Sequence, residues 1–299
     1  MTRSDDRLGI AMMSATMLLL AVQDGFSRHL AGEYNVWMVV TIRYWFFAIL
    51  ALGLAARRPG GLRRAWGTPR PILQACRGVL LVFEICGLVA AFTVLGLTES
   101  HAIFALCPLL IAALSVPLLG ERVGLWRWLA IGVGFVGVLV ILDPGAGVVS
   151  PFAVLALACA FAFALYSVLT RLVARTDDAL TSFVWTGVAG AIAITPLGLW
   201  AWEPMAPADW GWMTGLCAVA ALSMFMLIKT YETAEASVVQ PFAYLQLVFV
   251  TIIGVTVFDE VVRREVLIGG GIVIGAGLFT LWRARRTGAR GPQHGHPRA

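Results

Sequence analysis

Short polar connections divide the chain into apolar runs, most of which have the length of a membrane-crossing helix. The clearest run extends from Ala236 to Phe258 without a charged side chain. At about 1.5 Å per residue it can cross a hydrocarbon core of roughly 30 Å. Only 13% of the residues are charged and 60% are hydrophobic, whereas a soluble domain has about 25% charged residues. The sequence therefore predicts an all-α integral membrane protein surrounded largely by lipid.

The apolar runs predict ten transmembrane helices joined by short loops. Their approximate positions are 8–28, 36–56, 72–95, 100–120, 124–142, 150–171, 180–200, 211–229, 236–258 and 264–282. With the N-terminus in the cytoplasm, seventeen of the 22 Lys and Arg residues lie on the cytoplasmic side and three outside, while Arg43 and Arg77 lie within spans. This bias follows the positive-inside rule. It predicts an even number of spans with both termini in the cytoplasm.

The two halves of the sequence show a weak internal repeat. When Glu121 is aligned with Glu260, Gly132 meets Gly271, and each half ends in a glycine-rich span. Each half then holds five spans, so the second half must enter the membrane from the opposite side, as in many secondary transporters. We expect two inverted five-helix repeats, 1–145 and 146–283, followed by a disordered basic cytoplasmic tail, 284–299.

Three spans carry a family resemblance. They are the Arg-containing second span (TIRYWFFAILAL, 41–52), the fourth span, which ends in LLGER (118–122), and the ninth span (PFAYLQLVFVTIIGVTVFDE, 241–260). Together they resemble EamA-type members of the drug/metabolite transporter superfamily. The start of the ninth span is similar to a Pro-Phe-x-Tyr form of bacterial aromatic amino acid and metabolite exporters. The seventh span (180–194) departs from the pattern because it has no counterpart of Arg43.

The resemblance implies a secondary transporter of the bacterial inner membrane that works by alternating access. Its expected substrates are small metabolites, most of all aromatic or neutral amino acids, moved outward by a monomer or weak homodimer. Two alternatives remain within transport: an importer, or an exporter of drugs or nucleosides. A third, from another class, is a membrane-embedded enzyme acting on lipid, although no polar cluster at one interface favours an enzyme.

Charged side chains within a span are costly in lipid and therefore mark candidate functional positions. There are four: Asp24, Arg43, Arg77 and Glu84. Asp24 and Arg43 lie near the outer ends of neighbouring spans, so we expect them to pair, with or without a ligand. Arg77 lies near a cytoplasmic end, where reaching the headgroups is its expected role. Glu84, near mid-membrane, is a candidate for a proton or a substrate ammonium group, or else a packing residue.

The ninth span carries the strongest polar candidates. Gln240 and Tyr244 share a face by their i, i+4 spacing, whereas Gln246 points elsewhere. Amides in lipid need protein or water partners, so these residues predict either a binding site or contacts that hold helices together. Weaker candidates for the cavity lie in other spans: Gln23, Tyr166 and Trp185. His101, at the outer end of the fourth span, is expected to be a surface histidine that titrates near neutral pH.

Several motifs are missing from the sequence. It contains no G-x-x-x-x-G-K-[ST] phosphate-binding loop, and its five cysteines show no zinc or disulfide spacing. We therefore expect no cofactor and no metal. The basic residues follow the loops rather than forming a nucleic-acid patch, so the expected partners are a small-molecule substrate and the lipid bilayer.

Overall fold

The computed structural model describes residues 3–120, 124–142, 150–233 and 239–288. These residues form helices and no strand. The helices are α1 (Arg3–Glu33), α2 (Val36–Ala56), α3 (Gly61–Trp66), α4 (Pro71–Val94), α5 (Leu97–Phe104), α6 (Cys107–Leu119), α7 (Leu125–Leu142), α8 (Pro151–Val173), α9 (Ala179–Trp200), α10 (Asp209–Thr233), the 3₁₀ helix η2 (Gln240–Tyr244), α12 (Leu245–Val257) and α13 (Arg264–Gly288).

The number of membrane-crossing segments agrees with the predicted all-α membrane fold. Within the described residues, nine helical segments are long and apolar enough to cross a membrane, and a shorter apolar helix covers Phe242–Val257. α13 continues to Gly288, which is inside the segment 284–299 where the sequence predicted disorder. The rest of that segment lies outside the described residues.

The fourth and ninth spans are both broken. The fourth consists of α5 and α6, separated at Ala105–Leu106, with Pro108 in the first turn of α6. The ninth begins with η2, which contains Pro241, and continues as α12. Proline cannot donate to the helical ladder, which explains a break at each place. Corresponding helices are thus interrupted in the two halves.

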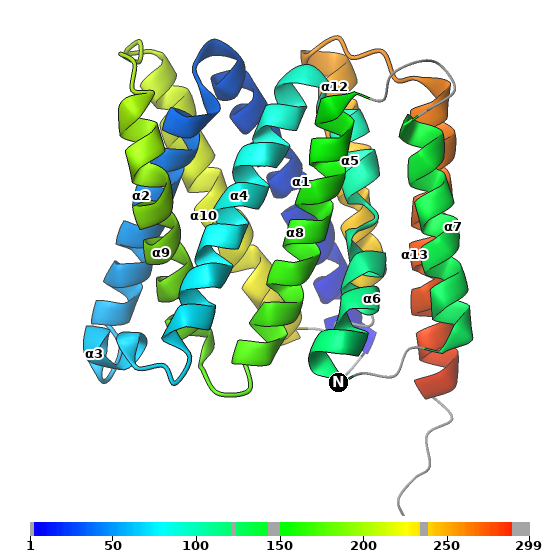
Figure 1. Cartoon of the computed structure of the whole chain (residues 1–299), viewed down its shortest axis with the longest axis horizontal. Coiled ribbons are helices and arrows are strands. Elements are labelled where there is room, and N and C mark those ends of the chain that lie inside the picture. Colours follow the sequence, from blue (N-terminus) through cyan, green and yellow to red (C-terminus); the bar gives the residue numbers. More distant parts are fainter. Residues whose placement is uncertain (1–2, 121–123, 143–149, 234–238, 289–299) are drawn as a thin grey trace, which may run out of the picture.

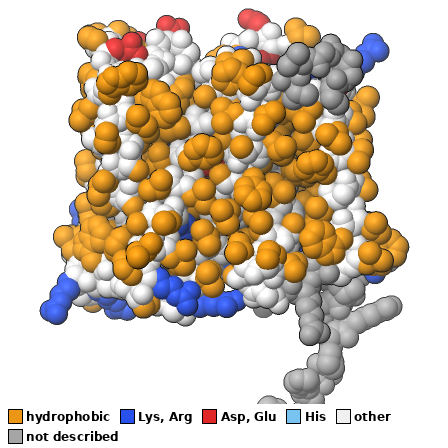
Figure 2. Space-filling view, viewed as in Figure 1, with side chains coloured by type: hydrophobic (Ala, Val, Ile, Leu, Met, Phe, Trp, Pro, Cys, Tyr) orange, Lys and Arg blue, Asp and Glu red, His pale blue; other side chains and the backbone are white. Residues whose placement is uncertain are grey.

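Successive membrane-crossing segments run in alternating directions through one bundle, with α5 and α6 together forming one segment (Figure 1). α1 begins and α13 ends at the same side, which we call the terminal face; the other side is the opposite face. In Figure 2, basic side chains gather along the terminal face and acidic ones along the opposite face, with hydrophobic side chains covering the wall between them. This distribution matches a protein that spans a bilayer.

Helices of one half pack against those of the other in a reciprocal pattern. α1 packs on α10 and α12, while α8 packs on α4 and α6. The first helix of each half thus lies against the third and fourth helices of the other half. The N-caps correspond as well: Asn35 accepts a hydrogen bond from the amide of Met38, and Asp178 from the amide of Thr181. Two inverted repeats would produce this arrangement.

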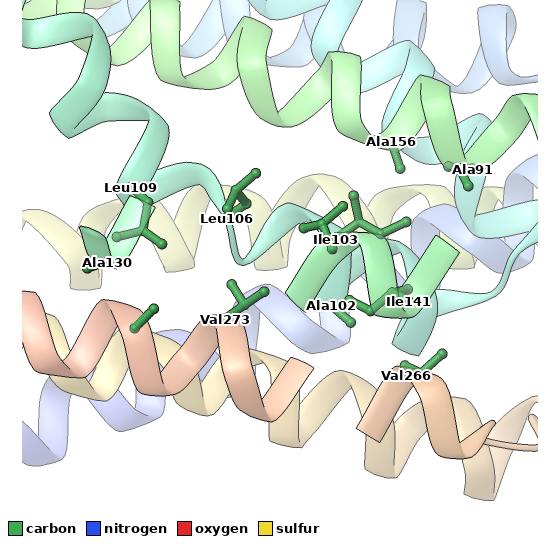
Figure 3. Packing of buried hydrophobic residues seen from close by; sticks show 13 residues of the cluster. Ala91, Ala102, Ile103, Leu106, Leu109, Ala130, Ile141, Ala156, Val266 and Val273 are labelled. Atoms are coloured by element: carbon green, nitrogen blue, oxygen red, sulfur yellow. The ribbon is translucent and has the colours of Figure 1, made fainter. Parts of the chain in front are cut away.

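Two further helix pairs, α7 with α13 and α2 with α9, also join the halves. At the first crossing, an added Cβ on Gly137 would lie 2.8 Å from the carbonyl oxygen of Gly269, and one on Gly269 would lie 2.4 Å from that of Gly137. Only glycine permits this close approach, as expected from the glycine-rich spans. A buried cluster beside the crossing includes Ile103 and Leu106, which project between α8 and α13 (Figure 3).

Candidate functional site

Three polar side chains from three different spans meet in the apolar interior. The Oδ2 atom of Asp24, on α1, accepts a hydrogen bond of 2.9 Å from Nε2 of Gln246, on α12. Nε2 of His101, on α5, lies 3.0 Å from the same oxygen. The imidazole does not point straight at the carboxylate, because Nε2 makes no well-directed hydrogen bond. We call these three residues the Asp24 node.

The node corrects two expectations from sequence. Asp24 pairs with His101 and Gln246 rather than with Arg43, which forms no ion pair with it. His101 is only 7% exposed and stacks on Phe92 at 5.2 Å, so it is not a surface residue. Gln246 faces α1 while Tyr244 faces α13, so these two side chains point apart, as expected from the sequence.

Two further charges lie close to the node. Glu84, on α4, is 4% exposed and lies within Coulombic range of Arg43 and Asp24. Its carboxylate has no hydrogen-bond partner among the described residues, although its oxygens are not completely enclosed. The same holds for the side-chain amide of Gln23, beside Asp24. A buried ionisable group without a protein partner is costly unless something else satisfies it.

A row of rings leads from the node toward the terminal face. His101 lies 6.3 Å from Phe104, Phe104 lies 5.4 Å from Phe163, and Phe163 lies 6.0 Å from Tyr166, measured between ring centroids. The guanidinium of Arg77 lies 5.1 Å from the Tyr166 centroid. Tyr166, a candidate from sequence, is thus at the far end of an aromatic wall that starts at the node.

Arg77 does not reach toward the headgroups as the sequence led us to expect. The residue is only 1% exposed, and its two terminal nitrogens donate to acceptors on three helices. The bonds go to Thr170 Oγ1 at 2.7 Å and to Gln74 Oε1, Ser182 O and Thr186 Oγ1, each at 2.8 Å. The rotation of α4 turns Arg77 toward α8 and α9, so this side chain joins helices from both halves.

The remaining candidates from sequence lie away from the node. The ring of Trp185 packs against Trp66 of α3, at 5.2 Å between centroids, near the terminal face. The hydroxyl of Tyr244 is buried without a partner among the described residues and lies against Gly277. The side chain of Gln240 lies outside the described residues. The structure thus brings together Asp24, His101 and Gln246, with Glu84, Arg43 and Gln23 close by.

One charged group outside the node has several partners that the sequence did not predict. Glu260 follows α12 and pairs with Arg28 of α1. Its Oε1 also accepts the amide of Leu97 at 2.5 Å, and its Oε2 accepts the amide and the hydroxyl of Thr98 at 3.1 and 2.7 Å. Leu97 and Thr98 begin α5, so the carboxylate caps that helix. We call Arg28, Glu260, Leu97 and Thr98 the Glu260 clamp. Nothing in the sequence signals it, since its members are far apart in the chain.

Comparison with known proteins places the chain in a family. Residues 7–143 and 151–282 each match the EamA-like transporter family, and the chain belongs to that family. The two matches divide the chain as the inverted halves would. A solved crystal structure aligns with a TM-score of 0.61 at 18% identity, covering 96% of this chain and 99% of the other. At that identity the likeness shows a shared fold.

Several curated relatives are transporters from bacteria. A protein of Rickettsia prowazekii named S-adenosylmethionine uptake transporter is 23% identical over 279 residues, which cover 93% of this chain and 94% of the relative. A riboflavin transporter of Vibrio cholerae is 30% identical over 175 residues, covering 56% and 57%. The chain is thus a multi-pass membrane protein of a transporter family, and the amino acid exporters suggested by its ninth span are not among these relatives.

Proposed function

We propose that this protein is a secondary transporter of a small metabolite that carries both an α-amino acid group and an aromatic ring system. S-adenosylmethionine, the substrate named for the Rickettsia relatives, has both features and an additional sulfonium charge. The observation that carries the proposal is the meeting of Asp24, His101 and Gln246 beside Glu84 and Arg43 inside the bundle. These residues come from five different spans.

The charges around the node complement such a solute. Two carboxylates, Asp24 and Glu84, suit an ammonium and a sulfonium group, and Arg43 suits a carboxylate, which guanidinium recognises well. Glu84 is the leading contact because its buried side chain makes no hydrogen bond or ion pair with another of the described residues. A neutral flavin would use none of these charges, which is why we favour a cationic zwitterion over riboflavin.

The aromatic wall supports the second half of the proposal. Phe104, Phe163 and Tyr166 present ring surfaces next to the charges. Flat heterocycles stack on such rings. The aromatic amino acids predicted from sequence would also fit here, so the size of the ring system and the sulfonium charge are what the experiment must separate.

The proposed setting is the bacterial inner membrane, with the terminal face in the cytoplasm because the basic loop residues gather there. We propose uptake as the direction, in keeping with the name of the Rickettsia relatives. Export of amino acids, the expectation from sequence, would require the opposite gradient. Alternating access around a site between two halves follows the pattern of transporters with inverted repeats.

The test is transport by the purified protein in liposomes. Uptake is measured for five labelled compounds: S-adenosylmethionine, phenylalanine, tryptophan, glutamate and riboflavin. The vesicles are prepared with and without internal substrate, and with and without a pH gradient. We expect S-adenosylmethionine to accumulate or exchange, and Glu84→Gln and Asp24→Asn to reduce that flux while Glu203→Gln, a change in a loop at the opposite face, does not. Preferred transport of riboflavin or of an ordinary amino acid would overturn the substrate assignment. No flux of any compound would overturn the function.

A further inference from the structure

The Asp24 node and the Glu260 clamp are built from the same three segments. α1 contributes Asp24 to the node and Arg28 to the clamp, one helical turn apart. α5 contributes His101 to the node and the amides of Leu97 and Thr98 to the clamp. The ninth span contributes Gln246 to the node and, just after its end, Glu260 to the clamp. The two sets of contacts are therefore stacked layers across one three-helix junction.

The clamp lies at the opposite face, where its residues line a cleft. The cleft has a volume of about 210 Å³ and is lined by Arg28, Glu260 and a second pair, Arg263 and Glu99. Arg263 and Glu99 are joined at 2.8 Å. Arg28, Thr98 and Glu260 of the clamp line this cleft, and the node begins one helical turn from Arg28 along α1, at Asp24.

The carboxylate of Glu260 sits where only glycine leaves room for it. A Cβ added to Gly96 would lie 2.5 Å from its Oε1 atom, and one added to Gly254 would lie 2.4 Å from its Oε2 atom. Gly96 also has a φ of +87°, which favours glycine. The group is thus held by a cation, by the start of α5 and by two glycines, and the ring of Phe258 lies 4.1 Å below the Arg28 guanidinium.

We propose that the Glu260 clamp is the gate of this transporter at the opposite face, and that it opens together with the Asp24 node. The inference rests on the proposed transport function. α5 is a short helix separated from α6 by the break at Ala105–Leu106, so it can move as a unit. When Glu260 leaves the start of α5, the helix loses its cap and its tie to α1. His101, four residues after Leu97, then loses the support that holds it at Asp24. Opening the gate thereby releases the residues proposed to bind the substrate.

The gate is tested by the accessibility of a single cysteine, which requires no substrate. The five natural cysteines are replaced by alanine or serine, and Gln23→Cys provides a reporter beside Asp24. A membrane-impermeant maleimide is then applied to the opposite face in vesicles of known orientation. We expect slow labelling in the parent, and labelling at least about tenfold faster in Glu260→Gln and in Arg28→Gln, which corresponds to about 1.4 kcal/mol. Glu203→Gln, at the same face, should leave the rate unchanged.

A second pair of variants distinguishes an opened gate from an unfolded protein. Gly254→Ala pushes the carboxylate away without removing it, and should speed labelling as Glu260→Gln does. Its matched control is Gly271→Ala, since an added Cβ there has no atom within 4 Å. Each variant must keep its elution volume in gel filtration. Equal labelling of the parent, Glu260→Gln and Gly254→Ala would overturn the gate.

Two double variants test the mechanism. Exchanging the charges with Arg28→Glu and Glu260→Arg restores an ion pair but places a cation at the amide end of α5, where the helix dipole repels it. We expect the reporter cysteine in this double variant to be labelled as fast as in Glu260→Gln. Labelling as slow as in the parent would show that the cap on α5 plays no part in the gate. For the coupling, Asp24→Asn and Glu260→Gln should have non-additive effects on the labelling rate, whereas effects that simply multiply would contradict movement as one unit. A gate confirmed by labelling with no transport in liposomes would leave the gate standing and remove the proposed function.

Discussion

Replacement of Arg77 by lysine separates two accounts of this side chain. If Arg77 reached toward lipid headgroups, lysine would serve equally well, because both residues extend a cation to the interface. The structure instead uses the planar guanidinium to reach acceptors on α8 and α9 as well as on its own helix. An ammonium on a flexible stem does not reproduce that fork. The structure therefore predicts a loss of stability for a substitution that sequence alone would regard as conservative.

The size of the loss follows from the contacts between helices. Three of the four acceptors, Thr170, Ser182 and Thr186, lie on other helices. Hydrogen bonds between helices in membranes contribute about 0.6 kcal/mol on average and up to about 1.7 kcal/mol each. Removing all three with Arg77→Met should thus cost roughly 2–5 kcal/mol. Arg77→Lys keeps at most one or two of them and should cost about 1–3 kcal/mol, whereas an interfacial side chain would lose no more than about 0.5 kcal/mol.

The assay is reversible unfolding in mixed micelles with increasing dodecyl sulfate, followed by far-ultraviolet circular dichroism. Thr170→Val and Thr186→Val remove one acceptor each and should shift the free energy of unfolding by about 0.6 kcal/mol. Arg63→Lys, at an exposed position on α3, serves as the cation control. The reasoning fails if Arg77→Lys unfolds at the same dodecyl sulfate fraction as the parent and Arg77→Met at only a slightly lower fraction, because the buried network would then contribute little to stability.

Three further predictions concern positions outside the node. Tyr244→Phe removes a buried hydroxyl that has no partner among the described residues. It should leave transport unchanged and raise the free energy of unfolding by no more than about 1 kcal/mol. A loss of transport would instead show that Tyr244 contributes to substrate binding. Gly198→Ala places a Cβ 2.0 Å from Oγ1 of Thr41 and should destabilise the α2–α9 pair by about 1–3 kcal/mol in the micelle assay. Its control is Gly53→Ala, which adds a Cβ in open space and should not destabilise the protein. The amide and hydroxyl of Thr181 hold the pKa of Asp178 below its usual range. The stabilisation by the Asp178 carboxylate is therefore complete above the unfolded pKa near 4 and disappears as the pH falls through the lower folded pKa. The difference in free energy of unfolding between the parent and Asp178→Ala should shrink on acidification, and a difference that is constant from pH 6 to pH 3 would contradict this.

Much of the fold could be predicted from hydropathy and proline. The apolar runs located the helices. The breaks in the fourth and ninth spans lie at Pro108 and Pro241, whereas Pro196 lies within the continuous helix α9. The charged and polar side chains within spans also pointed to Asp24 and Gln246, because lipid makes each of them costly, whereas His101 was expected at the surface and is buried.

Which of these residues meet could not be predicted, because hydropathy fixes the position of a helix along the membrane normal but not its rotation or its neighbours. Asp24 was expected to face α2 and instead faces α5 and α12. The rotation of α4 similarly buries Arg77. Glu260 was missed for another reason: its partners include backbone amides at the start of a helix far away in the sequence. Such groups are the same in every sequence and give no signal.

The central claim is that the Asp24 node and Glu84 bind a cationic, amino-acid-bearing solute, and equilibrium binding tests it most directly. Binding of S-adenosylmethionine to the detergent-solubilised protein is measured by isothermal calorimetry for the parent, Glu84→Gln, Asp24→Asn and Glu203→Gln. A hydrogen bond to a charged group contributes about 1.5–3 kcal/mol, so each of the two interior changes should weaken binding by about tenfold to a hundredfold, and Glu203→Gln should not change it. Parent-like affinity in both Glu84→Gln and Asp24→Asn would contradict the account.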